Sequence, residues 1–354
     1  MQRRHKYPKI LSAALLIFAC TAVASYGQIN NIDELIRTGQ QDAELLTRAY
    51  LKPLPSGFGA DINSGWFMNA KPHKSLGFDI QIRGAVAFVP GSDQSFDLND
   101  LNLQRTRPEN ANNTISPTIS GDDITGPGVI IEDENGDQVG QFNLPSGSGY
   151  NVVPAPMLQA SLGIIKDTDI TARFIPQSKA EDIEYGMLGF GIKHGINQWL
   201  PGGNLLPVDL SLMAGYTNID VTGNLDLRPE GFPADQEAAN ANYDNQEAQI
   251  SLNTFTVKAL VGKSLPFISL YGGVGYETST MDVDVAGNYP VSVSTPLGDG
   301  YDLVRDPISY QEDGNNSFSL LAGANVKLLF FNIFAEYTLA DYTVLNAGIG
   351  FSFR

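Results

Sequence analysis

The chain has 354 residues, a formal net charge of −17 and one cysteine, Cys20. This charge argues against nucleic acid as a partner, because phosphate backbones bind basic surfaces, and a single cysteine leaves no disulfide or thiolate metal site. Apolar residues make up 42% of the chain, but no run of 18 of them follows residue 30, so we expect no transmembrane helix after the leader.

Residues 1–27 are typical of a secretory signal, with four basic residues ahead of an apolar core. Cleavage is expected after Ala24 or after Gly27. Lipidation at Cys20 is a third way of processing the leader. In each case we expect the mature protein to be exported across the inner membrane.

A helix is predicted for residues 31–50, because apolar residues recur there at helical spacing and Asn31 can cap the first turn. Pro53 and Pro55 are expected to end it. The segment 28–56 therefore needs a surface for the apolar stripe of its helix. It could plug the lumen of a barrel or lie as a periplasmic cap against the barrel rim, and the sequence leaves both placements open.

Alternating apolar and polar residues, which are typical of β-strands, continue from there to the end of the chain. The pattern is clearest in the last 39 residues, where large apolar side chains lie opposite Gly, Ser, Asn and Thr. We predict eleven strands, near residues 57–70, 78–90, 156–165, 169–176, 184–196, 208–222, 248–262, 267–285, 316–328, 331–338 and 342–353.

The composition of the two strand faces favours a barrel with lipid outside and water inside. The final strand, Gly348 to Phe353, resembles the terminal strand by which outer-membrane barrels are recognised for assembly, although Arg354 follows its last Phe. The predicted fold is therefore all-β. It is an antiparallel transmembrane β-barrel over residues 57–354, preceded by a short helix.

The connections between the predicted strands sort by length. Short connections fall on one side of the barrel: 166–168, 197–207, 263–266 and 329–330. Long connections fall on the other: 91–155, 223–247 and 286–315. Outer-membrane barrels have short periplasmic turns and long outer loops. The three long loops hold 21 Asp or Glu against four Arg, so we expect an acidic outer surface.

Eleven strands is an odd number, whereas single-chain bacterial barrels usually have an even one. Either the first long loop hides a strand or the segment 57–70 lies outside the wall. A hairpin predicted from Gly128 to Leu144, with an Asn135-Gly136 turn, adds two strands and cannot change the parity. We expect about 12 strands, with 10 or 14 as alternatives.

Seven charged residues of the predicted strands lie opposite the apolar face. A Lys or Arg at the midplane of the lipid face would cost about 2–4 kcal/mol. We therefore predict that all seven face the lumen: Asp79, Arg83, Asp169, Arg173, Lys193, Lys327 and Glu336. Because both signs occur, they could form ion pairs that fill the barrel, or they could line a path for a solute.

No motif indicates an enzyme, a metal site or a bound cofactor. Asp133, Asn135 and Asp137 have the first spacings of a calcium loop, but the required glycine is missing, so a hairpin turn is the better interpretation. His73 and His194 have no partner at a recognisable catalytic spacing. A barrel lipase or protease remains an alternative, because catalytic triads assemble in space.

Two stretches resemble an uncharacterised family of bacterial outer-membrane barrel proteins. They are DAELLTRAYLKPLPSGFGADINSGWFMNAKPHKSLGFDI, from Asp42 to Ile80, and PAPMLQASLGIIKDTDITARFIP, from Pro154 to Pro176. The resemblance covers most of the mature chain and implies a barrel in the outer membrane, without any activity or ligand residues. In layout only, an N-terminal segment ahead of a barrel resembles the FadL-type transporters of hydrophobic compounds.

These observations predict a location in the bacterial outer membrane, with membrane lipid and the barrel-assembly machinery as partners. One predicted role is a passive channel or transporter for a small or hydrophobic solute. The alternative is a non-transport surface protein, either an adhesin or an anchor for a secretion or surface complex. A lumen packed shut would favour the second role, and a continuous lumen or a lateral opening would favour the first.

Overall fold

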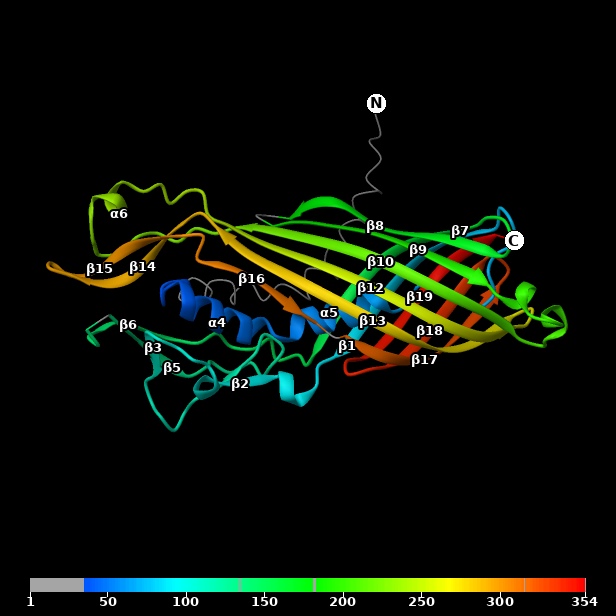
Figure 1. Ribbon diagram of the computed structural model, residues 1–354, viewed down its shortest axis with the longest axis horizontal. Helices are drawn as coiled ribbons and strands as arrows, with labels where there is room; N and C mark the ends of the chain where they lie inside the picture. Colours follow the sequence, from blue (N-terminus) through cyan, green and yellow to red (C-terminus); the bar gives the residue numbers. More distant parts are fainter. Residues whose placement is uncertain (1–34, 134, 181–182, 315, 354) are drawn as a thin grey trace, which may run out of the picture.

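The computed structural model describes residues 35–133, 135–180, 183–314 and 316–353 (Figure 1). The expected leader, residues 1–27, lies outside these ranges, as do the first residues of the helix expected at 31–50. The helices are α4 (Gln40–Leu51), α5 (Pro53–Asn63) and α6 (Gln236–Asn240), with short 3-10 helices η1 (Gly91–Asp93), η2 (Leu98–Asp100), η3 (Asn197–Trp199) and η4 (Gly203–Leu205).

Ten strands form a closed antiparallel barrel in which each strand pairs with the next one along the chain, and β1 pairs with β19 to close the ring. The strands are β1 (Phe78–Phe88), β7 (Val152–Gly163), β8 (Thr168–Ala180), β9 (Ile183–Gly195), β10 (Asp209–Asn224), β12 (Glu247–Ser264), β13 (Ile268–Ala286), β17 (Ser317–Leu328), β18 (Phe331–Leu339) and β19 (Thr343–Phe353).

The predicted all-β antiparallel barrel is confirmed, but the ring has ten strands rather than about 12. An additional strand, β16 (Ile308–Asp313), lies outside the ring and pairs with the far end of β13. Ten of the eleven predicted strands correspond to the ring. The odd one was the segment 57–70, which does not belong to the wall.

The segment 57–70 was predicted as a strand and is instead the body of helix α5 followed by a buried, non-regular stretch. Pro53 was expected to end a helix, but it occupies the first position of α5, where its missing N–H is not needed. Gly57 and Gly59 lie in α5. In the structure they let the helix approach the wall, since a methyl at Gly57 would lie 2.5 Å from Val153.

The four short and the three long connections lie at opposite ends of the barrel as predicted, but the short connection 340–342 between β18 and β19 lies at the same end as the long ones. We call the end of the barrel with the three long connections the loop end, and the end with the connections 164–167, 196–208, 265–267 and 329–330 the turn end. The chain enters β1 and leaves β19 at the turn end (Figure 1). The wall is uneven, because β13 has 19 residues while β18 has nine. The long strands therefore project beyond the short ones at the loop end.

The long connections are folded and not irregular. The predicted hairpin from Gly128 to Leu144 is present as β5 (Gly128–Glu132) and β6 (Gln138–Asn143). Strand β3 (Thr106–Pro108) pairs with β5 and extends this hairpin to a sheet of three strands. A second small sheet consists of β2 (Ser95–Asp97) and β4 (Ile115–Pro117). A third consists of β11 (Phe232–Pro233), β15 (Gly298–Arg305) and β14 (Asn288–Thr295). We call these connections, together with residues 35–52, the head.

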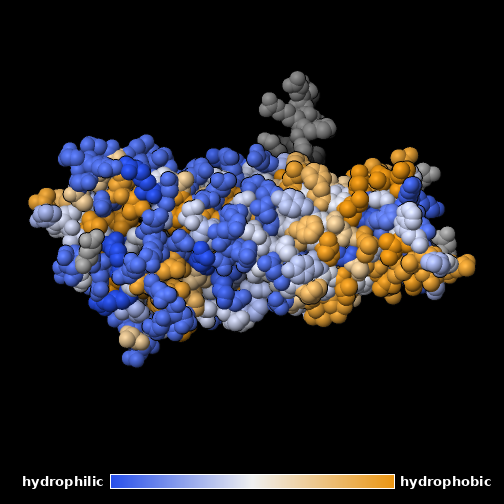
Figure 2. Space-filling model, viewed as in Figure 1, coloured by the Kyte–Doolittle hydropathy of each residue, from blue (hydrophilic) through white to orange (hydrophobic). Residues whose placement is uncertain are grey.

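An apolar belt surrounds the turn-end half of the barrel, and Figure 2 shows it in orange beside the mainly hydrophilic head. The outward side chains of neighbouring strands form this belt, as the alternating burial of each strand shows. Its exposed members include Ile80, Ile82, Phe174, Phe190, Leu212, Val274, Phe318, Ile333 and Ile349.

Strand β13 shows that both faces of the wall change character along its length. Near the turn end, Leu270 and Val274 are exposed on the outer face, while Glu277 is buried on the inner face. Nearer the loop end the outer face carries Asp284, and the inner face carries buried apolar residues such as Val283. The belt is therefore apolar outside and polar inside, whereas the head has the usual order of a water-soluble protein.

Helix α5 gives a direct test of this packing. In Gly59→Ala the added methyl would lie 2.5 Å from the Cβ of Ser279 and closer still to its hydroxyl. Overpacking of this kind costs about 1–3 kcal/mol, which exceeds the gain of about 0.5–1 kcal/mol from replacing a helical glycine. We expect a lower unfolding temperature in detergent. The matched control is Gly84→Ala, whose methyl meets nothing within 4 Å. A Gly59→Ala protein more stable than this control would contradict the packing.

Candidate functional site

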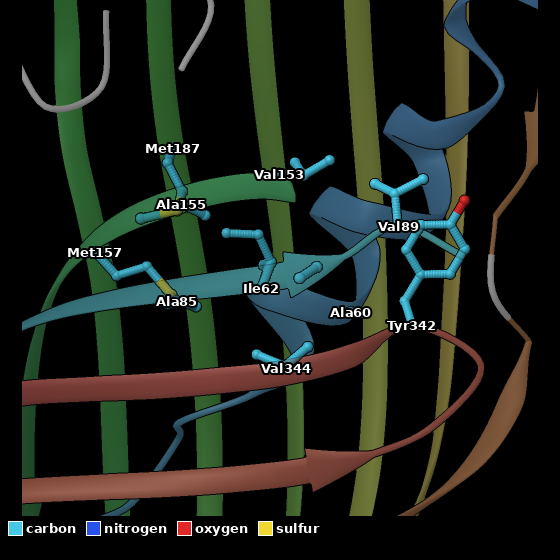
Figure 3. Close-up of a cluster of buried hydrophobic side chains, with 11 residues drawn as sticks. Ala60, Ile62, Ala85, Val89, Val153, Ala155, Met157, Met187, Tyr342 and Val344 are labelled. Carbon is cyan, nitrogen blue, oxygen red and sulfur yellow. The ribbon is translucent and has the colours of Figure 1, made fainter. Parts of the chain in front are cut away.

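Helix α5 and the residues that follow it lie inside the barrel, and we call residues 53–70 the plug. One face of α5 packs Ala60 and Ile62 against an apolar cluster from β1, β7 and β19, which includes Ala85, Ala155 and Val344 (Figure 3). Beyond the helix, Trp66 and Phe67 are buried in a second cluster nearer the turn end. The plug therefore contributes to the core of the barrel along its length.

Arg173 on β8 binds the plug through its backbone. Its guanidinium donates to the carbonyl oxygens of Ile62 and of Ser64, the latter at 2.7 Å, and its Nε donates to Gln159 Oε1 at 2.8 Å. The guanidinium also lies 3.8 Å from the centre of the Trp66 ring. A fully buried cation is thus stabilised by carbonyl dipoles and an aromatic face of the plug.

Arg83 on β1 binds the next part of the plug. Its Nη2 donates to the carbonyl oxygen of Phe67 at 3.0 Å, and its guanidinium lies 4.3 Å from the centre of the Phe334 ring. Gly65 adopts a positive φ of 65°, and a Cβ there would collide with Arg83 and Asn346. The plug can turn at this point because residue 65 has no side chain.

Glu336 on β18, which only β19 separates from β1 in the ring, binds the same turn. Its Oε1 accepts the backbone N–H of Gly65 at 2.9 Å, and its Oε2 accepts the hydroxyl of Tyr271 at 3.1 Å. Gln159 donates to the carbonyl oxygen of Trp66 at 3.1 Å. Side chains from β7, β1 and β18, on one arc of the ring, therefore hold a stretch of plug that has no regular secondary structure of its own.

A charged cluster closes the turn end of the lumen. His73 follows the plug, and its ring nitrogens lie 3.2 Å from carboxylate oxygens of Asp79 and Asp169. The two nitrogens can both donate only in the imidazolium form. Lys193 lies 3.2 Å from Asp169 and donates to the carbonyl oxygen of Asn69 at 3.1 Å. A cavity of about 10 Å³ remains here, about enough for one water molecule.

The structure places six of the seven predicted lumen charges on buried inner positions: Asp79, Arg83, Asp169, Arg173, Lys193 and Glu336. Lys327 lies on the same inner face near the turn end but is only half-buried. Sequence reasoning missed the buried ion pair of Lys258 and Glu277, whose Nζ and Oε1 lie 2.7 Å apart. The alternation of β12 could have revealed this pair, because Lys258 lies on the inner face of the strand while Phe255 and Val257 lie on its outer face.

His194 lies at the turn end and hydrogen-bonds a hydroxyl. Its Nε2 accepts the indole N–H of Trp199 at 2.8 Å, so its Nδ1 carries the hydrogen and donates to Thr168 Oγ1, also at 2.8 Å. A histidine in this tautomer cannot take a proton from the threonine. The pair is therefore not arranged for nucleophilic catalysis. Among the residues that the structure describes, no group of three His, Cys, Asp or Glu is placed to hold a metal ion.

The plug continues into the head through α4. The Asp42 carboxylate is buried and accepts the backbone N–H groups of Gln104, Arg105 and Thr106, each at 2.8 Å. Arg105 in turn donates to the carbonyl oxygen of Ser292 at 2.8 Å, which links the first long connection to the third. Helix α4 thus binds the first long connection of the head, and the chain that follows it enters the lumen as α5.

The junction of α4 and α5 is fixed at the loop end by Asp93. Its carboxylate lies 2.8 Å from Lys52 Nζ and accepts the hydroxyl of Tyr342 at 2.7 Å. Partial burial acts to raise the pKa of Asp93, but hydrogen bonds from Lys52 and Tyr342 outweigh it, so the pKa lies below its ordinary value.

No helix in the described part of the chain is long and apolar enough to cross a membrane. A family model described as "Family of unknown function (DUF6588)" matches residues 5–353. This match confirms the resemblance to an uncharacterised family. A search of the curated proteins found no match.

Several solved structures of membrane barrels are similar to the chain at low identity. The translocator domain of the autotransporter NalP from Neisseria meningitidis is 11% identical, with a TM-score of 0.29 over 80% of this chain and 89% of that one. The outer membrane protease OmpT from Escherichia coli is 10% identical, with a TM-score of 0.30 over 79% and 99%. Ail from Yersinia pestis is 10% identical, with a TM-score of 0.24 over 79% and 100%. Likeness at this level says nothing about what the chain binds or does.

The contacts of Arg173 predict how strongly the plug is held. Arg173→Ala removes the partner of two plug carbonyls and of Gln159, and each buried acceptor left unpaired costs about 1–3 kcal/mol. We expect a clear loss of thermal stability in detergent. Lys327→Ala, on the same inner face but without these contacts, should leave stability nearly unchanged. Lys179→Ala removes an exposed ion pair with Glu184 and should cost about 0–1 kcal/mol. Equal stability of all three variants would show that Arg173 does not hold the plug.

Proposed function

Because the chain belongs to the DUF6588 family of unknown function, we propose its role from the geometry: an outer-membrane barrel closed by its own plug, which carries a folded acidic head on the cell surface. The observation that carries the proposal is the continuity of plug and head. Of the two roles consistent with the sequence, this is the non-transport surface protein, an adhesin or an anchor for a secretion or surface complex.

The apolar belt supports a membrane location. Its outward residues would be exposed to water in a soluble protein, and burying apolar surface contributes about 25 cal/mol per Å². The strands of the ring are long enough for the 9–11 residues that a membrane strand requires. The outer face of β13 changes from Val274 to Asp284 on passing from the belt to the head. Membrane lipid around the belt and water around the head satisfy both compositions.

The packing of the plug supports a closed lumen. Its residues contact wall strands on different sides of the ring, through Arg173 on β8, Glu336 on β18 and Ser279 on β13, whose hydroxyl donates to the carbonyl oxygen of Pro55 at 2.9 Å. On β9 and β10 the wall carries glycines where the Trp66 ring packs, because a methyl at Gly191 or Gly215 would lie within 2.8 Å of that ring. A solute could pass only if the plug left these contacts.

The head opposes such a movement. Leu35 and Leu46 are buried in a cluster with Val129 and Leu144 of the first long connection. Asp42 holds three backbone N–H groups of the same connection. Withdrawal of the plug would therefore separate the head from its own core. This coupling favours a closed surface protein over a passive conduit.

The head is the surface that this arrangement presents to other molecules. The three long loops hold 21 Asp or Glu against four Arg, so a partner with a basic surface would be attracted at low ionic strength. We assign no catalytic role, since neither His73 nor His194 faces an activated nucleophile. The barrel-assembly machinery and membrane lipid are the remaining partners that the proposal requires.

Cell fractionation tests the proposed location. We expect the protein in the outer-membrane fraction, with a change in gel mobility on heating that is typical of a stable barrel. The reason is that lipid covers the belt. A soluble protein recovered from the periplasm would contradict the membrane assignment.

Reconstitution in planar bilayers tests the proposed closure. We expect the wild-type protein to give no steady conductance, because the plug contacts the wall on different sides. An open porin inserted under the same conditions serves as the positive control. Steady conductance of the folded wild-type protein would favour the conduit and overturn the closed-barrel proposal.

A further inference from the structure

The plug crosses the barrel in a definite direction. Ile36 is fully buried in the head, among Leu227 and Tyr289 of the second and third long connections. Helix α5 and residues 64–70 then pass through the lumen. His73 lies at the turn end, where β1 begins at Phe78 (Figure 1). The chain therefore runs from the loop end to the turn end before it enters the wall.

The anchoring of residues 35–37 shows that this direction is built into the head. The carbonyl oxygen of Arg37 accepts the backbone N–H of Ser292, a residue of strand β14, at 3.3 Å. The Arg37 guanidinium donates to the carbonyl oxygen of Arg228 at 3.2 Å and lies 3.7 Å from Glu230. All three long connections thus contact this short stretch, counting the packing of Leu35 against the first. The start of the described chain is held at the loop end.

We propose that the barrel exports its own N-terminal segment and displays the N terminus on the outer face of the membrane. The inference rests on the proposed function, which places the loop end outside the cell. A secreted chain meets the outer membrane from its inner side, so residues 35–52 must cross that membrane to reach the head. The lumen is the path that the finished structure shows, because the plug still occupies it.

The lumen wall suits the passage of a polypeptide. At the level of the belt it offers side chains that bind main-chain groups: Arg83 and Arg173 bind carbonyl oxygens, and Glu336 binds an N–H. Such groups act on the backbone and not on any one side chain. The segment that remains in the path is narrow at Gly57, Gly59 and Gly65, where a Cβ would meet the wall. The proposed substrate of the export step is therefore the covalently attached N-terminal peptide itself.

Cysteine labelling on intact cells tests the direction of the plug. The only natural cysteine is Cys20, in the leader. Once the leader has been cleaved off, an introduced cysteine is therefore the only thiol that can react with the probe. Asn30→Cys follows both expected cleavage points and precedes the described chain. Leu297→Cys marks the exposed tip of the β14–β15 hairpin at the loop end, and Leu205→Cys marks an exposed position at the turn end. The probe is a maleimide that cannot cross membranes, and heat-dependent gel mobility verifies that each variant folds.

We expect Asn30→Cys and Leu297→Cys to react to a similar extent on intact cells, and Leu205→Cys to react only after permeabilisation. Reaction of Leu297→Cys but not Asn30→Cys on intact cells would overturn the export proposal and leave the proposed function standing. Protection of Asn30→Cys even after permeabilisation would also overturn it, because a displayed terminus is open to reagent. Reaction of Leu205→Cys alone would reverse the orientation, so that the proposed function and the export proposal would fail together.

Should Asn30→Cys fail to fold, a second variant gives the same answer. A short epitope inserted between Asn30 and Asn31 leaves every described residue unchanged. Antibody binding to intact cells would support export, and binding only after permeabilisation would overturn it.

Discussion

The exchange of polar and apolar character between the two faces of a single strand is the constraint on which the structure depends. Strand β13 is long enough to leave the apolar belt and continue into the head, and its two faces exchange character on the way. In the belt the outer face is aliphatic and the inner face carries Glu277. Towards the head the outer face carries Asp284 and the inner face carries Val283. A strand in one uniform solvent would have no reason to make this exchange.

The plug follows from that constraint. A wall with lipid outside must place its charges inside, and a buried charge without a partner costs several kcal/mol, against a total stability of about 5–15 kcal/mol for a typical domain. A wide lumen could hydrate such charges. In this ring of ten strands the chain supplies its own backbone instead, as carbonyl oxygens for Arg83 and Arg173 and an N–H for Glu336. The plug thus replaces water as the partner of the wall.

Much of the wall could be predicted from the sequence, because alternation is a local property. Ten strands and the inner positions of Arg83, Arg173 and Glu336 follow from it. A plug was considered for residues 28–56, but its position at 53–70 could not be predicted, because Pro55, Gly57 and Gly59 resemble a strand boundary when tertiary contacts are unknown. The wall residues that bind the plug could not be predicted either. Gly65 and Glu336, for example, are 271 residues apart, and no local pattern brings them together. The head was predicted as long acidic loops, and its fold depends on contacts of Asp42 with residues that are also distant in sequence, Gln104 being 62 residues away.

The central claim is that plug and wall form one rigid unit. Amide hydrogen exchange of the protein in detergent or lipid tests it most directly, because residues 64–70 have no regular secondary structure to protect them. Protection of Gly65 must come from Glu336 and the surrounding wall. The account predicts that plug amides, including that of Gly65, exchange about as slowly as those of β1 and β7. Exchange of the plug within seconds, beside a protected wall, would contradict it.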